Sequence, residues 1–389
     1  MALTKKQTQV LREFCLAYGA SGYEKEISNL FKKYLVQYGY ELVYDHLGSI
    51  YGLKRCHQDH PLKVMVCAHS DEVALKVTNI NEQGLIQFQE TSIWSQILMG
   101  QRVTLINQNH EKFKGAICAT PPHLLSAELK NQPVATKNMV ADFGFLNRQD
   151  ALNHHIRMGD VIVVDGSFEV LNENRILAKA LDNRVGCALC VELLKTMSQI
   201  DLPYDLYIGL NVQEEVGLRG ATTAAQMIRP DFAIVVDCSP ANDLTSSKEL
   251  GQLGKGLLIR VIDGNMIAFP QLIDYQRNLC KKYQIPYQYY LSNGGTDAGQ
   301  IHRTYHGVLT LTSCICARNI HSNSSIMDSN DYQANLKFLK LVLKQFDEYL
   351  RVVLYGAAPM DKATIEWYND LGIELIQGYG LTESSPVLT

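Results

Sequence analysis

YDLYIGLNVQEEVGLRGATTAAQMI, residues 204–228, contains an apolar run, two adjacent glutamates and a second run rich in alanine. The first nine residues have the near-continuous apolar character of a strand that is buried on both faces of a sheet. The run ATTAAQMI that follows is predicted to form a helix. A strand, a loop and a helix in this order place Glu214 and Glu215 side by side at the carboxyl end of a buried strand.

The rest of the second half of the chain repeats this alternation of strand and helix. Strands are expected at 232–236, 257–263 and 307–317, and helices at 180–197, 271–284 and 330–350. Near the N-terminus, residues 4–37 have a helical period that GASGYE (19–24) interrupts, and residues 61–68 form a buried-strand pattern. The motif GASGYE is expected to cap the second of these helices. Together these segments predict an α/β fold with a mixed, largely parallel sheet covered on both faces.

Residues 73–165 differ from the segments on either side of them. Short strand-like runs follow one another between turn residues, with one helix-like stretch at 147–159. This series predicts a small β-barrel or sandwich. Because helix and strand alternate again from residue 166, we expect the barrel to be inserted into an α/β domain formed by residues 1–72 and 166–351.

Composition excludes several classes of partner. The chain has 389 residues, is 46% hydrophobic and 20% charged, and carries a formal charge of -4, so it lacks an electrostatic footprint for nucleic acid or membrane. No stretch is typical of a signal peptide or reaches the about 18 apolar residues of a spanning helix, and a cytoplasmic location is therefore expected. The ten cysteines, including the pair Cys187 and Cys190, are expected to pack as small buried side chains.

Acids and histidines occur where the predicted strands end. Ligands bind beyond the carboxyl ends of the strands in open α/β sheets, so these positions are expected to converge. The candidates are His69, Asp71, Asp182, Glu214, Glu215, Asp237 and His321. Two imidazoles with several carboxylates are typical ligands of divalent zinc, cobalt or manganese.

The spacing of these residues suggests a division of roles. Asp182 begins a helix between the two halves of the set, so its carboxylate is the natural bridge between two ions about 3.5–4 Å apart. Successive residues of an extended chain point to opposite sides, so one of Glu214 and Glu215 can bind metal while the other acts as general base. Asp71 follows His69 by two residues and is placed to orient that imidazole. Each residue alone has a simpler interpretation, such as a helix N-cap for Asp182, and only the joint pattern favours a site.

Six motifs in a fixed order carry a family resemblance. They are AHSDE (68–72), ALDNRVG (180–186), QEEVGLRGA (213–221), VVDCSP (235–240), GGTDAGQIH (294–302) and RNIHS (318–322). The chain resembles the glutamyl, or tetrahedral, aminopeptidase family of dinuclear metallopeptidases over roughly residues 4–350. The resemblance implies a zinc-peptidase-like α/β/α sandwich with an inserted β-barrel domain, two divalent ions per chain, zinc before cobalt or manganese, and a homo-oligomer from dimer to dodecamer.

The same resemblance implies a role for each site residue. It assigns one ion to His69 and Asp237, the other to Glu215 and His321, and the bridge to Asp182. It makes Glu214 the general base and Asp71 the orienting acid. It places at the substrate site Gly294, Gly295, Thr296, Asp297 and Arg318.

The leading hypothesis is therefore a metal-dependent aminopeptidase that acts on peptides through an activated water and a glutamate base. A related hydrolase, an N-deacylase or a carboxypeptidase, is an alternative, because Arg318 offers a cation for an α-carboxylate. A non-catalytic metal-binding scaffold is an alternative from a different class.

Residues 352–389 do not fit this family. GYGLTESSP (378–386) resembles a core motif of acyl-CoA synthetases and other adenylate-forming enzymes. Only about one strand–helix–strand unit of that fold is present, so the other walls of a nucleotide pocket are missing. We expect an appended, non-functional fragment without adenylation activity, produced by a gene fusion or a frameshift.

Overall fold

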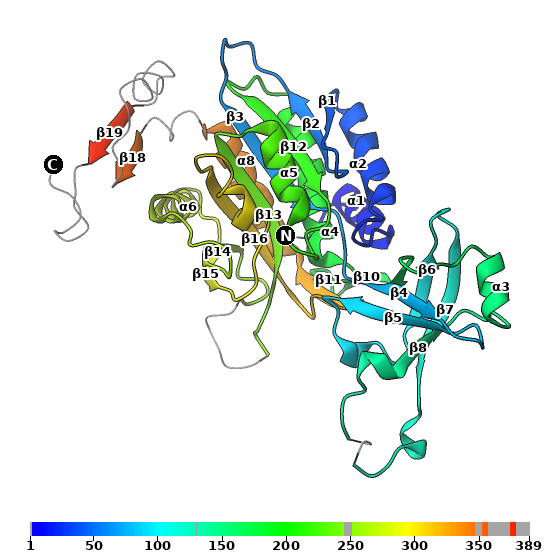
Figure 1. The fold of residues 1–389 in the computed structure, drawn as a ribbon. Helices are drawn as coiled ribbons and strands as arrows, with labels where there is room; N and C mark the ends of the chain where they lie inside the picture. The colour runs from blue at the N-terminus through cyan, green and yellow to red at the C-terminus, as the bar shows by residue number, and fades with distance from the viewer. Residues whose placement is uncertain (1, 129–130, 245–250, 347–351, 357–373, 379–389) are drawn as a thin grey trace.

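One mixed sheet organises the larger part of the molecule (Figure 1). The computed structural model describes residues 2–128, 131–244, 251–346, 352–356 and 374–378, and within them this sheet has 11 strands. The main path runs β1 (Glu41–Tyr44), β2 (Ile50–Lys54), β12 (Asp205–Asn211), β3 (Lys63–His69), β13 (Phe232–Pro240), β16 (Leu309–Arg318), β17 (Ser325–Asp328), β11 (Arg175–Ala178) and β10 (Phe168–Leu171). A side branch at β16 adds β14 (Leu257–Ile262) and β15 (Tyr287–Leu291).

The centre of the sheet is parallel and fully buried. Strands β12, β3, β13 and β16 pair in parallel with one another, and nearly every residue in them is buried. Their carboxyl ends therefore meet at one edge, as the sequence predicted. The flanking strands β1, β2, β17, β11 and β10 pair antiparallel. The sequence did not predict these short strands, because runs of four or five residues give no continuous apolar signal.

Helices cover both faces of the sheet. One face carries α1 (Lys5–Leu16), α2 (Lys25–Gln37), α4 (Leu181–Met197) and α8 (Ser329–Lys344), and the other carries α5 (Arg219–Ile228) and α7 (Ala298–Ile301). Helix α6 (Pro270–Lys282) packs beside β14. The alternation of strand side chains separates two cores, since Val66 packs with α4 and α8 while its neighbours Met65 and Cys67 pack with α5 and α7.

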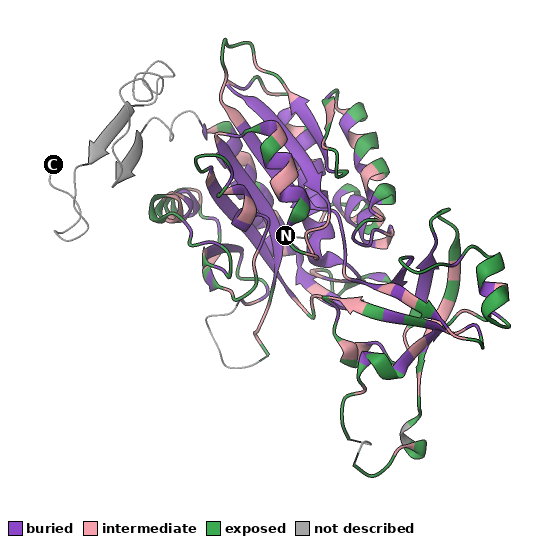
Figure 2. Cartoon of the chain, viewed as in Figure 1, coloured by how far each residue is buried: buried purple, intermediate pink, exposed green. Residues whose placement is uncertain are grey.

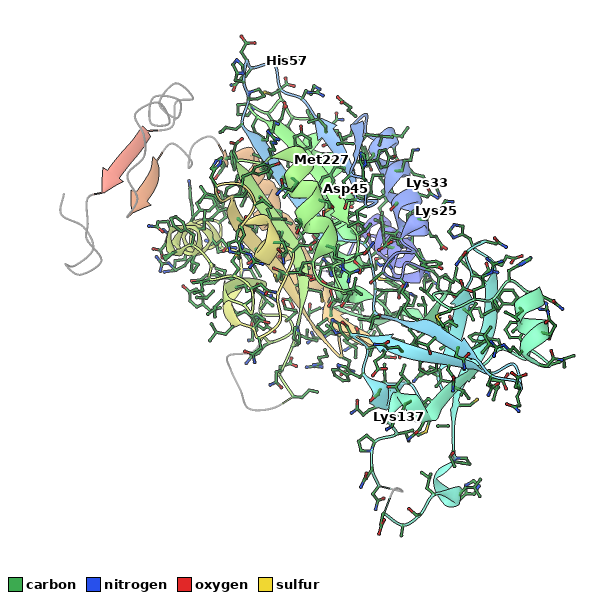
Figure 3. The ribbon with its side chains drawn as sticks, in the orientation of Figure 1. Lys25, Lys33, Asp45, His57, Lys137 and Met227 are labelled. Carbon is green, nitrogen blue, oxygen red and sulfur yellow. The ribbon has the colours of Figure 1, made fainter. Side chains whose placement is uncertain are left out.

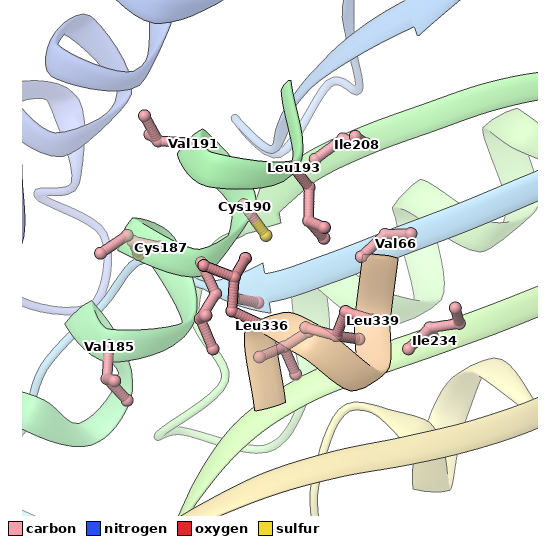
Figure 4. Close-up of a cluster of buried hydrophobic side chains, with 14 of the residues drawn as sticks. Val66, Val185, Cys187, Cys190, Val191, Leu193, Ile208, Ile234, Leu336 and Leu339 are labelled. Atoms are coloured by element: carbon pink, nitrogen blue, oxygen red, sulfur yellow. The ribbon is translucent and has the colours of Figure 1, made fainter. Parts of the chain in front are cut away.

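The larger core lies between the sheet and the helices α4 and α8. Figure 4 shows Val185, Cys190 and Leu193 of α4 and Leu336 and Leu339 of α8 with the strand residues Val66, Ile208 and Ile234. Figure 2 shows the same layering as a buried sheet between helices whose outer faces are exposed. On α2, the exposed Lys25 and Lys33 lie on that outer face (Figure 3).

The inserted segment forms a separate closed barrel. Its strands in barrel order are β4 (Ala74–Ile80), β5 (Ile86–Thr91), β8 (Met139–Asp142), β7 (Lys112–Ala119), β6 (Arg102–Ile106) and β9 (Val161–Val164). It has its own apolar core, and it also contains α3 (Arg148–Asn153) and short 3₁₀ turns at Ser95–Ile97, Pro122–Leu124 and Thr136–Asn138. The strands fall inside the predicted segment 73–165, while the boundaries between segments stay a prediction.

Several remaining expectations concern the cysteines, the helices and the C-terminal segment. The ten cysteines are free, and all but Cys56 and Cys118 are buried. None of the helices in the described ranges has the length and apolar character needed to cross a bilayer. Of the predicted fragment 352–389, the structure describes two strands that pair in parallel, β18 (Val352–Gly356) and β19 (Glu374–Gly378), and the rest lies outside the described residues.

Candidate metal centre

The predicted acids and histidines converge at the carboxyl edge of the parallel strands. His69 ends β3, and Asp237 lies in the second half of β13. Glu214 and Glu215 follow β12, while His321 follows β16. Asp182 comes from the first turn of α4. Among the described residues, three groups bring their ligand atoms within 4.8 Å of one another: His69, Asp182 and Asp237; Asp182, Glu215 and His321; and His69, Glu214 and Glu215.

The first half of the centre surrounds Nε2 of His69. This atom lies 3.1 Å from Oδ1 of Asp182 and 3.6 Å from Oδ1 of Asp237. The other ring nitrogen, Nδ1, lies 3.5 Å from Oδ1 of Asp71. The imidazole therefore presents Nε2 to the acids of the centre and Nδ1 to the acid that was predicted to orient it.

The second half surrounds Nε2 of His321. This atom lies 3.3 Å from Oδ2 of Asp182 and 3.5 Å from Oε2 of Glu215. Asp182 thus directs one carboxylate oxygen to each histidine. Its backbone is not helical, with φ −79° and ψ 108°, and the N-cap position of α4 is occupied by Ala180 rather than by Asp182. The simpler interpretation of Asp182 as a helix cap is therefore wrong, and the carboxylate is free to bridge.

The donor set fits divalent cations. Buried carboxylates outnumber the histidines, and Oε1 of Glu215 has no hydrogen-bond partner among the described residues. Without a cation, burial and the neighbouring Asp182 raise the pKa of Glu215 to about 8. Burial lowers the pKa of His321, but its hydrogen bond to Asp182 and the charge of Glu215 outweigh this effect and raise it to about 9. Divalent ions would offset this repulsion between acids and occupy the unpaired oxygens.

The two adjacent glutamates face different groups, as the sequence predicted. Oε2 of Glu214 lies 4.0 Å from Nε2 of His69, whereas Oε2 of Glu215 faces His321. Burial raises the pKa of Glu214 well above its ordinary value, and the charges of Glu215 and Asp237 add to the shift although His69 opposes it. The loop thus supplies one acid to each half of the centre.

Asp71 contacts more than His69. Its Oδ1 accepts a hydrogen bond from the backbone N–H of Glu214 at 2.9 Å, and its Oδ2 accepts one from that of Glu215 at 3.1 Å. The hydroxyl of Ser21 donates to the same Oδ2 at 2.6 Å. Sequence reasoning missed these backbone contacts, because nothing in the spacing of residues 71 and 214 indicates them.

The loop predicted to line the substrate site is mostly anchored within the protein. Thr296 and Asp297 are buried, and Oδ2 of Asp297 accepts a hydrogen bond from Nδ2 of Asn211 at 2.8 Å. Gly294 is exposed and Gly295 is half-buried. The exposed part of the loop is therefore its glycine backbone.

Arg318 has a partner that the sequence did not reveal. Its Nε and Nη2 donate to the two carboxylate oxygens of Asp243 at 2.7 Å and 2.8 Å. This paired geometry occupies one side of the planar guanidinium. Arg318 is thus engaged inside the protein before any substrate arrives.

A small pocket, partly open to solvent, borders the second half of the centre. Asp182, Glu215 and His321 form one side of it. The barrel residues Val73, Ile93 and Val164 contribute apolar side chains, and Lys179 lies at the same pocket with its ammonium 2.5 Å from Oε2 of Glu72. The pocket therefore joins the candidate centre to the inserted barrel.

Comparison with known proteins gives two family matches and several similar aminopeptidases. A model of the M42 glutamyl aminopeptidase family matches residues 48–338, and a model of the AMP-binding enzymes matches residues 302–389. The glutamyl aminopeptidase of Lactococcus lactis is 34% identical over 83% of this chain and 92% of its own length. The lysyl aminopeptidase of Pyrococcus furiosus is 29% identical over 87% of this chain and 96% of its own length.

Solved structures agree with these relatives. A TET aminopeptidase from a marine sediment archaeon, Thaumarchaeota archaeon SCGC AB-539-E09, has a TM-score of 0.83 and 31% identity over 94% of this chain and all of its own. The TET1 peptidase of Pyrococcus horikoshii, which assembles into a tetrahedron or a large octahedral shell, has a TM-score of 0.78 and 26% identity over 87% of this chain and 99% of its own. These similarities cover both the α/β domain and the barrel.

Proposed function

The chain belongs to the M42 glutamyl aminopeptidase family and is a metal-dependent hydrolase of N-terminal peptide bonds, and from this premise we propose that its centre binds two divalent ions. His69 and Asp237 would hold one ion, Glu215 and His321 the other, and Asp182 both. The observation that carries the proposal is the division of the Asp182 carboxylate between the two histidines, at 3.1 Å and 3.3 Å. Nitrogen and oxygen donors of this kind suit zinc foremost, and accept cobalt or manganese.

The bound ions would supply Lewis acidity that polarises the peptide carbonyl and lowers the pKa of water. Glu214 is the proposed general base, because its carboxylate lies beside the first half of the centre without being needed to complete either half. It would take a proton from the attacking water and return it to the leaving amine. Asp71 would fix the positions of the His69 ring and of the Glu214 backbone relative to each other for this transfer.

Substrate contacts are proposed from the glycine loop and from Arg318. The exposed backbone of Gly294 and Gly295 would face the peptide, while the buried Thr296 and Asp297 hold the loop in place. Arg318 would border the site together with Asp243 rather than bind a free carboxylate. This pairing favours an aminopeptidase over the carboxypeptidase alternative.

We also propose a homo-oligomer as the working form. The TET1 peptidase of Pyrococcus horikoshii, at a TM-score of 0.78, can assemble into a tetrahedron or a large octahedral shell, and a PhTET1 structure with the same TM-score has a dodecamer in its asymmetric unit. The fragment 352–389 would take no part in catalysis. Every proposed site residue precedes residue 322, and the family match ends at residue 338.

Hydrolysis of aminoacyl chromogenic substrates tests the assignment. We expect turnover by the wild-type protein, loss of turnover after chelation, recovery with zinc, cobalt or manganese, and two ions per chain by elemental analysis. Glu214→Gln should keep its metal and lose about 10²- to 10⁴-fold in kcat. Full activity of this variant would refute the role of Glu214, and two bound ions without turnover of any peptide would favour the scaffold alternative.

A further inference from the structure

Two carboxylates hold three consecutive backbone N–H groups of the loop that carries the proposed base. The N–H of Gln213 donates to Oε1 of Glu24 at 3.2 Å. The N–H groups of Glu214 and Glu215 donate to the two oxygens of Asp71. The Asp71 carboxylate comes from the loop that follows β3. The Glu24 carboxylate comes from the start of α2, far away in sequence.

Glu24 does not serve the helix that it precedes. It occupies the N-cap position of α2 without making a side-chain cap hydrogen bond. Its carboxylate is instead buried, and Oε1 accepts hydrogen bonds from Gly22 at 2.7 Å and from Gln213 at 3.2 Å. The expectation that GASGYE caps the second helix is therefore wrong for the Glu24 side chain, which reaches the catalytic loop.

Ser21 from the same motif reaches the loop by a second route. Its hydroxyl donates to Oδ2 of Asp71 at 2.6 Å, the oxygen that also accepts the N–H of Glu215. The motif therefore supports the loop at two points, directly through Glu24 and indirectly through Asp71.

The motif is itself fixed to the core. Gly19 and Glu72 exchange hydrogen bonds, with the N–H of Glu72 donating to the carbonyl of Gly19 at 2.9 Å and the N–H of Gly19 donating to Oε1 of Glu72 at 3.2 Å. Arg184, fully buried in α4, contacts both at 3.4 Å and 3.1 Å. The ammonium of Lys76 donates to the carbonyl of Ser21 at 3.0 Å. A rigid support on one side of the loop is therefore in place before substrate binds.

The loop needs such support because its backbone is not in a preferred conformation. Gln213 leaves β12 with φ 56°, in the left-handed region that a non-glycine residue adopts only at a cost. A hydrogen-bond acceptor at its N–H stabilises this conformation against alternatives. Because Glu214 is the next residue, a change in the Gln213 backbone moves the Glu214 carboxylate.

We infer that Glu24 is a positioning residue of the aminopeptidase reaction, which fixes the backbone of Gln213 and thereby the proton-transfer position of Glu214. The inference rests on the proposed function, in which Glu214 transfers the proton. Glu24 acts as a hydrogen-bond acceptor whose side chain is long enough to bring Oε1 to the N–H of Gln213. Its negative charge is not required. In support, Glu24 lies near the like-charged Asp71, and burial together with Asp71 raises its pKa to about 7.

Three substitutions of Glu24 distinguish the effect of its side-chain length from the effect of its charge. Glu24→Gln keeps the acceptor oxygen at full length and removes the charge, Glu24→Asp keeps the charge and withdraws the oxygen by one methylene, and Glu24→Ala removes both. We expect Glu24→Asp and Glu24→Ala to lower kcat roughly 10- to 100-fold with little change in KM, since a small displacement of a catalytic group has this effect. Glu24→Gln should restore kcat to within about threefold of wild type.

The matched control is Glu26→Ala. Glu26 lies in the first turn of the same helix, is exposed, and pairs with Lys112 at the surface, so its loss should leave kcat unchanged. Metal content and melting temperature are measured for every variant, with zinc-loaded protein. If Glu24→Ala fails to fold, the comparison of Glu24→Gln with Glu24→Asp still decides between reach and charge.

The inference is overturned if Glu24→Asp is as active as Glu24→Gln, or if Glu24→Asp and Glu24→Ala both keep wild-type kcat. It is also overturned if loss of kcat follows loss of metal in proportion, because the role would then be structural. Glu214→Gln, assayed in parallel, distinguishes a failure of the proposed general base from a failure of the positioning role of Glu24. If Glu214→Gln is fully active, the proposed base is wrong, whereas an inactive Glu214→Gln with unaffected Glu24 variants refutes only the positioning role.

Discussion

Nε2 of His69 lies 3.1 Å from Oδ1 of Asp182, and the second oxygen of the same carboxylate is turned to the other half of the centre. One short side chain thus contacts both histidines. The proposed dinuclear site depends on this carboxylate more than on any other ligand. Loss of a terminal ligand would weaken the binding of one ion, whereas loss of the bridge would weaken the binding of both.

Asp182→Asn is therefore predicted to release both ions, because an amide supplies one neutral oxygen where the carboxylate supplied two charged ones. Elemental analysis after dialysis should find well under one ion per chain, with activity reduced at least about 10²-fold. Glu41→Gln is the control, since Glu41 lies at the surface, where its carboxylate pairs with Arg55. Full metal content in Asp182→Asn would contradict a bridging role.

Asp71→Asn is predicted to lower kcat roughly 10- to 100-fold. Both oxygens of Asp71 accept backbone N–H groups, and an amide places its own N–H₂ against one of these donors. The loop that carries Glu214 should move, and the ring of His69 should lose its partner. Steady-state kinetics with metal analysis measures this. An unchanged kcat at full metal content would show that Asp71 does not hold the loop.

The strand-end residues of the site could be predicted because the signals that place them are strong. His69 and Asp237 follow or end long apolar runs of parallel strands, whose carboxyl ends must share one edge. Asp182 could be predicted because its motif lies, along the sequence, between the motif of His69 and the motifs of the later ligands. Its actual backbone, which is not helical at that residue, could not be foreseen from a helix-start pattern.

The supporting residues could not be predicted, because their partners lie far away in the chain. Glu24 looks like an ordinary helix start, yet its carboxylate bonds to a backbone N–H that is 189 positions away. Arg318 shows a charge in the sequence but not its ion pair with Asp243. Such side-chain contacts leave no periodic pattern, and only the folded chain brings them together.

The stability of the metal-free protein should depend on the ionisation of Glu24. Its pKa is raised from 4.5 to about 7 by burial and by Asp71. The folded protein then keeps a proton that the unfolded chain releases between these values. The stabilising contribution is complete below about pH 4.5 and is lost as the pH rises to about 7, and it amounts to roughly 3 kcal/mol at most.

Urea unfolding at pH 5 and pH 8, with chelator present, measures this effect. Wild type is expected to lose more stability between these pH values than Glu24→Gln, which has no proton to release. Glu26→Gln serves as the control for a surface acid, and its pH dependence should follow wild type. Equal pH dependence in wild type and Glu24→Gln would show that Glu24 is already ionised in the folded state at pH 5.

Blocking each terminus of a peptide in turn should show which free terminus the enzyme requires. Because Asp243 already occupies the guanidinium of Arg318, we predict that C-terminal amidation of a tripeptide changes kcat/KM by less than about threefold. Acetylation of its N-terminus should abolish cleavage. Liquid chromatography of the three peptides after digestion gives the rates. Strong loss on amidation, with cleavage of the acetylated peptide, would support the carboxypeptidase alternative.

Removal of residues 352–389 is predicted to leave the aminopeptidase reaction unchanged. The proposed ligands, base and substrate loop all precede residue 322, and α8 ends at Lys344, before the segment that is removed. The AMP-binding match extends over residues 302–389 and so overlaps the α/β domain itself. No residue of the proposed site lies within the fragment 352–389. A chain ending at residue 351 should therefore equal the full chain in kcat, KM and metal content, and the full chain should form no acyl-adenylate from ATP and fatty acids. Light scattering of both chains reports the oligomer in parallel. A shorter chain that loses turnover while keeping its metal and its assembly would show that the fragment contributes to the site.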